Sequence, residues 1–306
     1  MPYSSFSTLL DDARRENLSL AECVQAREAE ENDTSIAEVR ARLAETLQVM
    51  RDAVHQGSAA DIRSRSGLTG GDAARLFASA NDSESINILG SRFTHVLASS
   101  MATVELNAAM GRIVAAPTAG ASGVLPGIFL TLARNHMLSD DTLIDGLLVA
   151  GAIGACFAAQ ATLSGAAGGC QAEVGTAAAM TAAATTYMLG STVRNTGAKS
   201  PELNEAVGHA ASFAMQGQLG LVCDPVAGLV EVPCIARNAT GSAVALAAAQ
   251  MALSGLSFPI PFDEVVDAAS RVGAAIPPSL RETAKGGLAT TATGKHIERE
   301  LGTGTL

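Results

Sequence analysis

The feature that most constrains this 306-residue sequence is a 90-residue stretch, from Met101 to Gly190, with very little charge. It holds seven Asp, Glu, Lys or Arg side chains, whereas the first 60 residues hold 17. Such an apolar stretch is stable in water only when most of it is buried, because exposed apolar surface costs free energy. The sequence therefore predicts a solvated N-terminal region, residues 1–60, packed on a nearly charge-free interior.

Small residues must build that interior, because aromatic residues make up 3% of the chain and Trp is absent, while Gly alone accounts for 30 residues. Alanine is the best helix former, and alternation of polar and apolar residues beyond four positions is hard to find. The chain is too apolar to be disordered and too poor in charge for a coiled coil. We therefore predict an all-α fold: a compact Ala/Gly-rich helical domain whose glycine and proline loops form the functional site.

Two Ser-x-x-Glu capping boxes, at Ser19 and Ser35, predict helix starts in the N-terminal region, and the Ser200–Pro201 pair predicts another. No Pro-rich or charged linker divides the chain, so we expect a single domain over residues 1–306. Further helices are expected over 91–111, 125–138, 141–163, 174–190, 201–219, 239–255, 262–274 and 279–285, with a surface insertion at 192–201.

The net charge of −10 argues against nucleic acid or an anionic membrane surface as a partner. The apolar run 146–163 is mostly Ala and Gly and contains Gln160 and Thr162, so it predicts a buried helix rather than a membrane span. No signal peptide is visible. Five cysteines in such a chain indicate a reducing compartment, and we expect a cytoplasmic protein.

Three of the five cysteines lie in or beside Gly/Pro loops: Cys170, Cys223 and Cys234, with the spacing C-x52-C-x10-C. Cys23 and Cys156 are interpreted as isolated thiols. Thiolates are soft ligands, and the absence of a local C-x2–4-C pair argues against structural zinc. Widely spaced cysteines suit a four-iron cluster with one iron left open, although three independent buried thiols fit the spacing as well.

A short pattern, Pro-x-Ala-Gly followed by another proline, occurs twice, at Pro117–Gly120 and Pro225–Gly228. It predicts two similar loops that meet at one site, or it is a chance repeat in a chain rich in these residues.

Five blocks of the sequence then point to a family. They are Ser66–Ala73 (SGLTGGDA), Gly111–Gly127 (GRIVAAPTAGASGVLPG), Ser164–Gly175 (SGAAGGCQAEVG), Gly220–Asn238 (GLVCDPVAGLVEVPCIARN) and Leu280–Ala289 (LRETAKGGLA). Together they closely resemble the α subunit of the iron–sulfur-dependent L-serine dehydratases, and the resemblance covers nearly the whole chain.

This resemblance implies that Cys170, Cys223 and Cys234 hold a [4Fe–4S] cluster. It further implies a cytoplasmic, oxygen-sensitive lyase that makes pyruvate and ammonia from L-serine in amino-acid catabolism and gluconeogenesis, without pyridoxal phosphate. The Ser-Ser-Ser-His-Thr motif that the family carries in its β subunit or fused β domain is absent from this sequence. The resemblance therefore implies a separate β subunit as partner.

Polar and glycine residues near these blocks are the candidates for substrate binding, since loop N–H groups and hydroxyls can hold a carboxylate. They are Thr69, Asn107, Thr118, Gly120, Ser122, Gly123 and Ser164. The catalytic base is not identified. Arg237 and Asn238 are expected to hold their loop rather than bind the substrate, and Glu173 is expected to act as a helix cap rather than as an acid near the cluster.

Three alternatives stay open. The chain could catalyse β-elimination from another small amino acid, threonine or cysteine. It could be a non-catalytic, cluster-free partner subunit. A pyridoxal-phosphate enzyme would need a Schiff-base lysine, and the chain has three, Lys199, Lys285 and Lys295, with no other pyridoxal feature.

Overall fold

The computed structural model describes residues 3–136, 138–194 and 197–302. These residues form thirteen α-helices and no β-strand, with one isolated bridge between Cys223 and Arg281. The prediction of an all-α fold is therefore confirmed. Buried apolar residues from Tyr3 to Ala269 form one core cluster, while the single-domain boundary stays a prediction.

The α-helices are α1 (Phe6–Glu16), α2 (Leu20–Glu31), α3 (Ile36–Gly57), α4 (Asp72–Asn81), α5 (Ser91–Ala108), α6 (Val124–His136), α7 (Asp140–Gln160), α8 (Gly165–Gly168), α9 (Thr176–Thr192), α10 (Pro201–Gln216), α11 (Cys234–Leu253), α12 (Phe262–Ala275) and α13 (Ala292–Glu300). Short helices of other types are η1 (Ala119–Ala121), η2 (Gln171–Gly175), η3 (Val226–Gly228), η4 (Pro278–Leu280) and η5 (Gly287–Thr290). The expected insertion at 192–201 includes residues 195–196, which lie outside the described residues.

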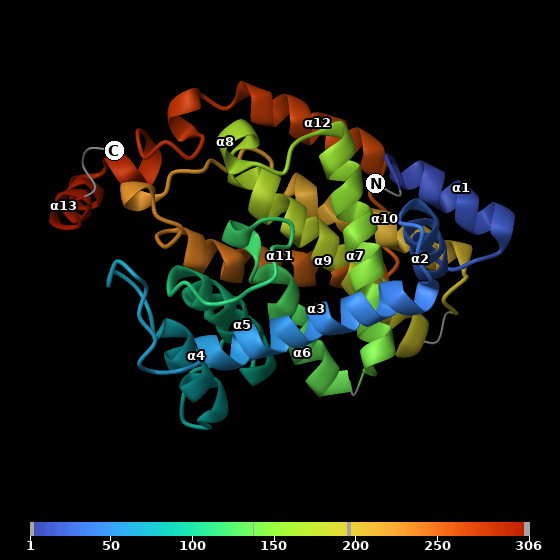
Figure 1. Cartoon of the computed structure of the whole chain (residues 1–306), viewed down its shortest axis with the longest axis horizontal. Helices are drawn as coiled ribbons and strands as arrows, with labels where there is room; N and C mark the ends of the chain where they lie inside the picture. Colours follow the sequence, from blue (N-terminus) through green and yellow to red (C-terminus); the bar gives the residue numbers. More distant parts are fainter. Residues whose placement is uncertain (1–2, 137, 195–196, 303–306) are drawn as a thin grey trace.

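Helix α9 forms the centre of the molecule. It packs against α6, α7, α10 and α11, as Figure 1 shows, and 14 of its 17 residues are buried. A helix that is apolar on all sides is a core helix, and its alanines let four neighbours approach at once. The charge-poor stretch noted in the sequence is therefore the physical interior.

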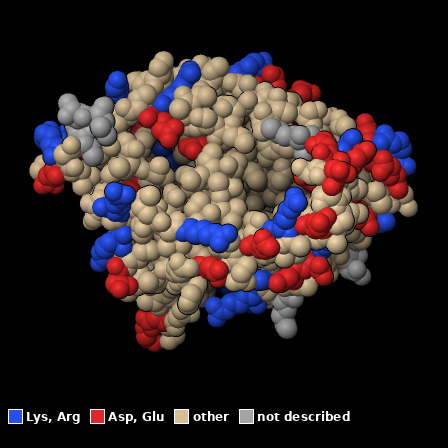
Figure 2. All heavy atoms as spheres, in the orientation of Figure 1, with Lys and Arg blue, Asp and Glu red and all other residues tan. Residues whose placement is uncertain are grey.

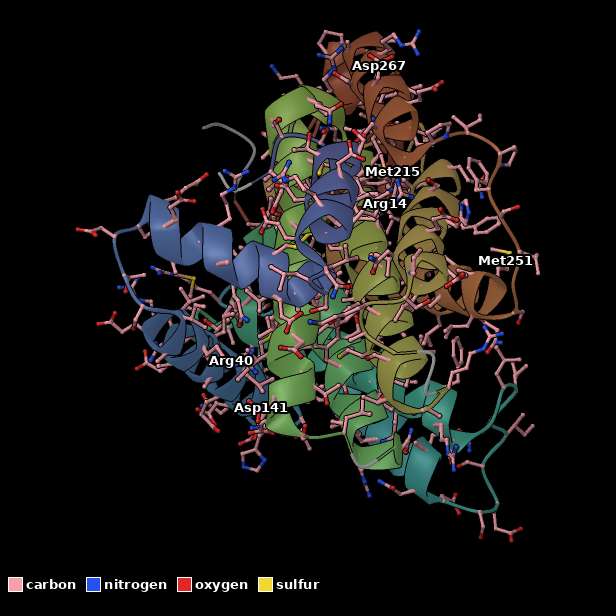
Figure 3. All side chains as sticks on the ribbon, turned by 90° about the vertical axis from the view of Figure 1, so that its right-hand side faces the viewer. Arg14, Arg40, Asp141, Met215, Met251 and Asp267 are labelled. Carbon is pink, nitrogen blue, oxygen red and sulfur yellow. The ribbon has the colours of Figure 1, made fainter. Side chains whose placement is uncertain are left out.

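The N-terminal helices form the charged rim. Both predicted capping boxes are present, at Ser19 and Ser35. Arg40 of α3 makes ion pairs of 2.8 Å with Asp141 and with Asp145, which join α3 to α7 (Figure 3). Figure 2 shows many charged side chains gathered over the N-terminal helices, at the right of the view, whereas an uncharged area lies just above the centre of this face.

Helix α7 is long and apolar enough to cross a membrane by composition alone, with a mean hydropathy of 1.9 over its best 18 residues. However, 67% of that window is buried inside the protein. Its apolar residues pack against α9, α2 and α3, which is the arrangement of the buried helix that the sequence predicts.

One predicted helix, 279–285, is wrong. The chain there makes only the short 3-10 turn η4 and then takes left-handed backbone at Glu282 (φ 61°) and Ala284 (φ 53°). Its hydrogen-bonding groups go elsewhere: the N–H of Cys223 donates to Leu280 O (2.9 Å), and the N–H of Glu282 donates to Cys223 O (2.7 Å). Tertiary hydrogen bonds to the Cys223 loop therefore override the local helix signal.

Close helix packing at Gly127 of α6 gives a testable prediction. A Cβ at Gly127 would lie 2.8 Å from Ser100 Cβ and 3.0 Å from the Ser100 backbone on α5, whereas a Cβ at Gly151 of α7 would meet nothing within 4 Å. We expect Gly127→Ala to destabilise the protein by about 1–3 kcal/mol through overpacking. Gly151→Ala should be neutral or stabilising by up to about 1 kcal/mol, because it only improves helix propensity. Urea unfolding measures both, and equal effects would contradict this packing.

Candidate functional site

The three loop cysteines meet at one place although 64 residues separate the first from the last. Cys170 precedes the π-helix η2, Cys223 lies in the loop after α10, and Cys234 is the first residue of α11. All three are free, buried thiols. Single π-turns inside helical segments often mark functional sites.

The electrostatics show that these thiols share one environment. Burial raises the pKa of Cys170 to about 11 and that of Cys234 to about 12, and burial also raises the pKa of Cys223 strongly. The charge of Cys170 adds to the rise at both of the other two cysteines. Arg237 opposes the rise at Cys170 and Cys234. Three thiolates this close to one another call for a compensating positive charge.

Two glycines pack closely against this cluster. A Cβ on Gly165 would lie 2.5 Å from Glu173 Oε2 and 3.3 Å from Cys223 Sγ. A Cβ on Gly120 would lie 3.4 Å from Glu173 Oε1. A larger residue at either position would therefore press on the Glu173 carboxylate, and at Gly165 also on the Cys223 sulfur, so glycine allows these groups to pack closely.

Glu173 is the residue that the sequence interpretation misjudged. The helix-cap expectation is wrong, because the carboxylate contacts side chains: it accepts a hydrogen bond from Thr118 Oγ1 (2.7 Å) and lies 3.9 Å from Cys223 Sγ. Burial raises its pKa, with a further contribution from Glu282, while the Thr118 hydroxyl opposes the rise. The sequence spacing could have revealed this position of Glu173. It lies one turn after Cys170, and residues three apart in a helix lie on the same face.

Arg237 holds the Cys223 loop, as the sequence suggested. Its guanidinium donates to Val222 O (2.8 Å) and pairs with Asp224 Oδ1 (2.8 Å). Asp224 in turn accepts from the N–H of Leu288 (2.7 Å). The residues on both sides of Cys223 are thus fixed to α11 and to η5, so the position of its sulfur is set by the fold.

Asn238 fixes the opposite loop. Its amide nitrogen donates to Gly120 O (2.7 Å) and Cys234 O (2.9 Å), and its amide oxygen accepts from the N–H of Gly123 (2.9 Å). The side chain is fully buried. One residue therefore joins the loop that carries Thr118 to the first turn of α11, where Cys234 lies.

This geometry makes Asn238→Ala a strongly destabilising change. It removes the partners of the Gly123 N–H and the Gly120 carbonyl, and each buried polar group left unpaired costs about 1–3 kcal/mol. We expect a loss of about 2–4 kcal/mol in the free energy of unfolding, measured in urea. Asn32→Ala is the matched control, because Asn32 is exposed at the end of α2 and donates to the Glu28 carbonyl there. It should change stability by about 0.5 kcal/mol or less. Equal effects of the two substitutions would contradict the bridging role.

The two repeated Pro-x-Ala-Gly segments differ in backbone conformation. The first runs into η1, whereas the second contains η3 and has left-handed backbone at Ala227 (φ 55°). A Cβ on Gly120 would lie 3.6 Å from Val230 Cγ1, two residues after the second copy. The two loops are therefore neighbours, and both border the cysteine cluster.

Behind Val230 lies a second polar centre that the sequence did not reveal. Glu231 is buried and accepts hydrogen bonds from Ser66 Oγ (2.7 Å) and Thr69 Oγ1 (2.6 Å). It lines a cavity of about 590 Å³ together with Asn107 and Val230. Two predicted substrate-binding residues, Thr69 and Asn107, therefore gather around Glu231 rather than around the cysteines.

The remaining predicted substrate residues divide into two groups. Thr118 and Gly120 border Glu173 directly, and Ser164 is exposed immediately before α8. In contrast, Ser122 is fully buried, and the N–H of Gly123 is already bonded to Asn238. A methyl group on Gly123 would also collide with the Ser100 carbonyl. In this structure Ser122 and Gly123 therefore support the loop, and their N–H or hydroxyl groups do not face an open site.

No three His, Cys, Asp or Glu side chains in the described ranges converge tightly enough to hold a single metal ion. Cysteine thiolates are the usual protein ligands of iron–sulfur clusters.

Comparison with known proteins identifies the family of this chain. Residues 15–289 match the family model described as serine dehydratase alpha chain. The probable L-serine dehydratase alpha chain of Bacillus subtilis is 40% identical over 304 residues, which cover 99% of this chain and 97% of that protein. The L-serine dehydratase alpha chain of Peptoniphilus asaccharolyticus is 38% identical over 96% of both chains. The L-serine dehydratase of Mycobacterium tuberculosis is 36% identical, and the match covers 97% of this chain but 63% of that longer protein.

Proposed function

The chain belongs to the serine dehydratase alpha chain family, and on that premise we propose that it is the cluster-binding chain of an iron–sulfur L-serine dehydratase, a lyase that releases pyruvate and ammonia. The observation that carries the proposal is the cluster of three buried cysteines beside Glu173, against which Gly120 and Gly165 pack closely. We place the enzyme in the cytoplasm, where its five free thiols stay reduced.

The residues present fit a [4Fe–4S] cluster. Cys170, Cys223 and Cys234 would be its three ligands, which leaves one iron without a protein thiolate. Burial alone disfavours thiolates at these positions, so the positive iron ions would supply the charge that the site lacks. When bound, the cluster would supply a Lewis acid for the hydroxyl of the substrate.

The chain's own groups would then do the remaining work. Serine must lose its α-proton and its hydroxyl, which gives water and aminoacrylate, and the imine tautomer of aminoacrylate hydrolyses to pyruvate and ammonia. Glu173 lies 3.9 Å from Cys223 Sγ and has a raised pKa, and we propose that it accepts the α-proton. The Thr118 hydroxyl holds the carboxylate in place through its hydrogen bond to Oε1.

Substrate positioning is proposed for the polar residues on either side of Val230. Thr118, Gly120 and Ser164 lie on the cysteine side, whereas Thr69 and Asn107 lie on the Glu231 side. Asn107 offers both a donor and an acceptor to a zwitterionic amino acid. The α-chain names of the relatives support a separate β chain as partner, which would complete the site.

The test is anaerobic purification of the chain together with its β chain, followed by assay of pyruvate release from L-serine. We expect turnover of L-serine in preference to L-threonine or L-cysteine. A preference for L-threonine or L-cysteine would change the proposed substrate but leave the proposed β-elimination in place. An iron-free complex that turns over none of the three amino acids would support the non-catalytic, cluster-free subunit instead.

A further inference from the structure

A second cavity, far from the cysteines, lies between α4, α5 and α6 and has a volume of about 540 Å³. Asn81 of α4, Arg92 and His95 of α5, and Arg134 of α6 line it. Figure 1 shows α4 to α6 at the end of the molecule opposite α8. Helix α6 connects the two regions: it starts beside Gly123 and reaches Arg134 about 15 Å further along its axis.

The cavity is positively charged and has no acidic lining. Arg92 and Arg134 are both exposed, and neither guanidinium makes an ion pair or a hydrogen bond with any residue that the structure describes. Most other arginines of the chain are paired with Asp or Glu, as Arg40, Arg51 and Arg237 show. Two unpaired guanidinium groups at one cavity mouth are the donors that recognise carboxylates and phosphates.

The groups around the two arginines also favour an anionic ligand. Helix α5 starts at Ser91 without an acidic residue in its first turn, so its positive dipole end is not neutralised. The His95 ring lies against the Phe77 ring at a tilt of 51°, with the ring centroids 5.7 Å apart. Burial and the nearby Arg134 lower the pKa of His95, so at neutral pH its imidazole is an uncharged hydrogen-bonding group on the cavity wall.

We propose that this cavity binds a small anion, carboxylate or phosphate, that carries no ammonium group. The absence of any Asp or Glu from its lining leaves nothing to neutralise an ammonium, so a zwitterionic amino acid is disfavoured. A 2-oxo acid such as pyruvate, the product under the proposed function, has the right charge. In that one respect the choice of probe rests on the proposed function.

Titration calorimetry on the full chain tests the proposal with three probes: pyruvate, inorganic phosphate and L-serine. We expect pyruvate, phosphate or both to bind, and the tighter of the two shows whether the cavity prefers a carboxylate or a phosphate. L-serine should bind at least tenfold more weakly than that anion. Arg92→Gln and Arg134→Gln should each weaken anion binding at least tenfold. Arg271→Gln removes the same charge from an exposed i,i+4 pair on α12 and should leave binding unchanged.

Equal binding of L-serine and the anions would overturn the proposal, as would unchanged binding in both cavity variants or no anion binding at all. Cys223→Ala tests independently where the anion binds. If the anion binds in the cavity at Arg92 and Arg134, this substitution should leave its affinity unchanged. Loss of binding in Cys223→Ala but not in the arginine variants would assign the anion to the cysteine site. Because no activity is measured, anion binding at Arg92 and Arg134 would stand even if the chain released no pyruvate.

Discussion

Alanine at any one of Cys170, Cys223 or Cys234 is expected to reduce pyruvate release by the anaerobic complex to background. Each sulfur is one of the three proposed ligands, and its loss would leave one iron without a protein ligand. The Cys223 loop itself would stay in place, because Arg237 and residues 280–282 hold its backbone. The assay is pyruvate formation from L-serine.

Cys156→Ala is the control for these three changes, because Cys156 is equally buried but lies on α7 inside the apolar core. It removes one buried thiol at a modest packing cost and should keep activity. Full activity in any of the three site variants would contradict the proposed ligand set.

The second large effect is expected at Glu173. Glu173→Gln keeps the size of the side chain and an oxygen that can accept from Thr118, but it cannot take a proton. We expect kcat for L-serine to fall about 10²–10⁴-fold, the usual contribution of a general base, while the iron content stays unchanged. Exchange of the α-hydrogen of serine with solvent deuterium should fall in parallel.

Two readouts separate a proton-transfer role from a structural one. A purely structural Glu173 would show loss of iron, whereas a base would not. Glu264→Gln, at the exposed start of α12, removes a carboxylate of the same kind and should leave kcat unchanged. Activity of Glu173→Gln within twofold of the wild-type value would remove Glu173 from the mechanism.

The parts of the fold that local chemistry determines were predictable. Capping boxes at Ser19 and Ser35 and the Ser200–Pro201 start lie where the sequence places them, because these signals act within one helical turn. Helix 91–111 was predicted three residues too long, since α5 ends at Ala108. Helix 239–255 was predicted to start late, because α11 starts at Cys234 directly after a proline loop.

The parts of the site that depend on long-range contacts were not predictable. Glu231 and Asn238 act on loops more than 100 residues away, and nothing in their local sequence identifies these partners. The 279–285 segment has a good local helix start but gives its backbone hydrogen bonds to Cys223. Sequence motifs therefore located the cysteines, whereas only the fold shows that Glu173 and Thr118 lie beside them.

The central claim is that Cys170, Cys223 and Cys234 together hold an iron–sulfur cluster. Iron and acid-labile sulfide per chain, measured after anaerobic purification, test it most directly. We expect about four of each in the wild-type chain and in Cys156→Ala, with loss of iron in each of the three site variants. An iron-free wild-type chain, or full iron content in Cys170→Ala, Cys223→Ala and Cys234→Ala, would contradict it.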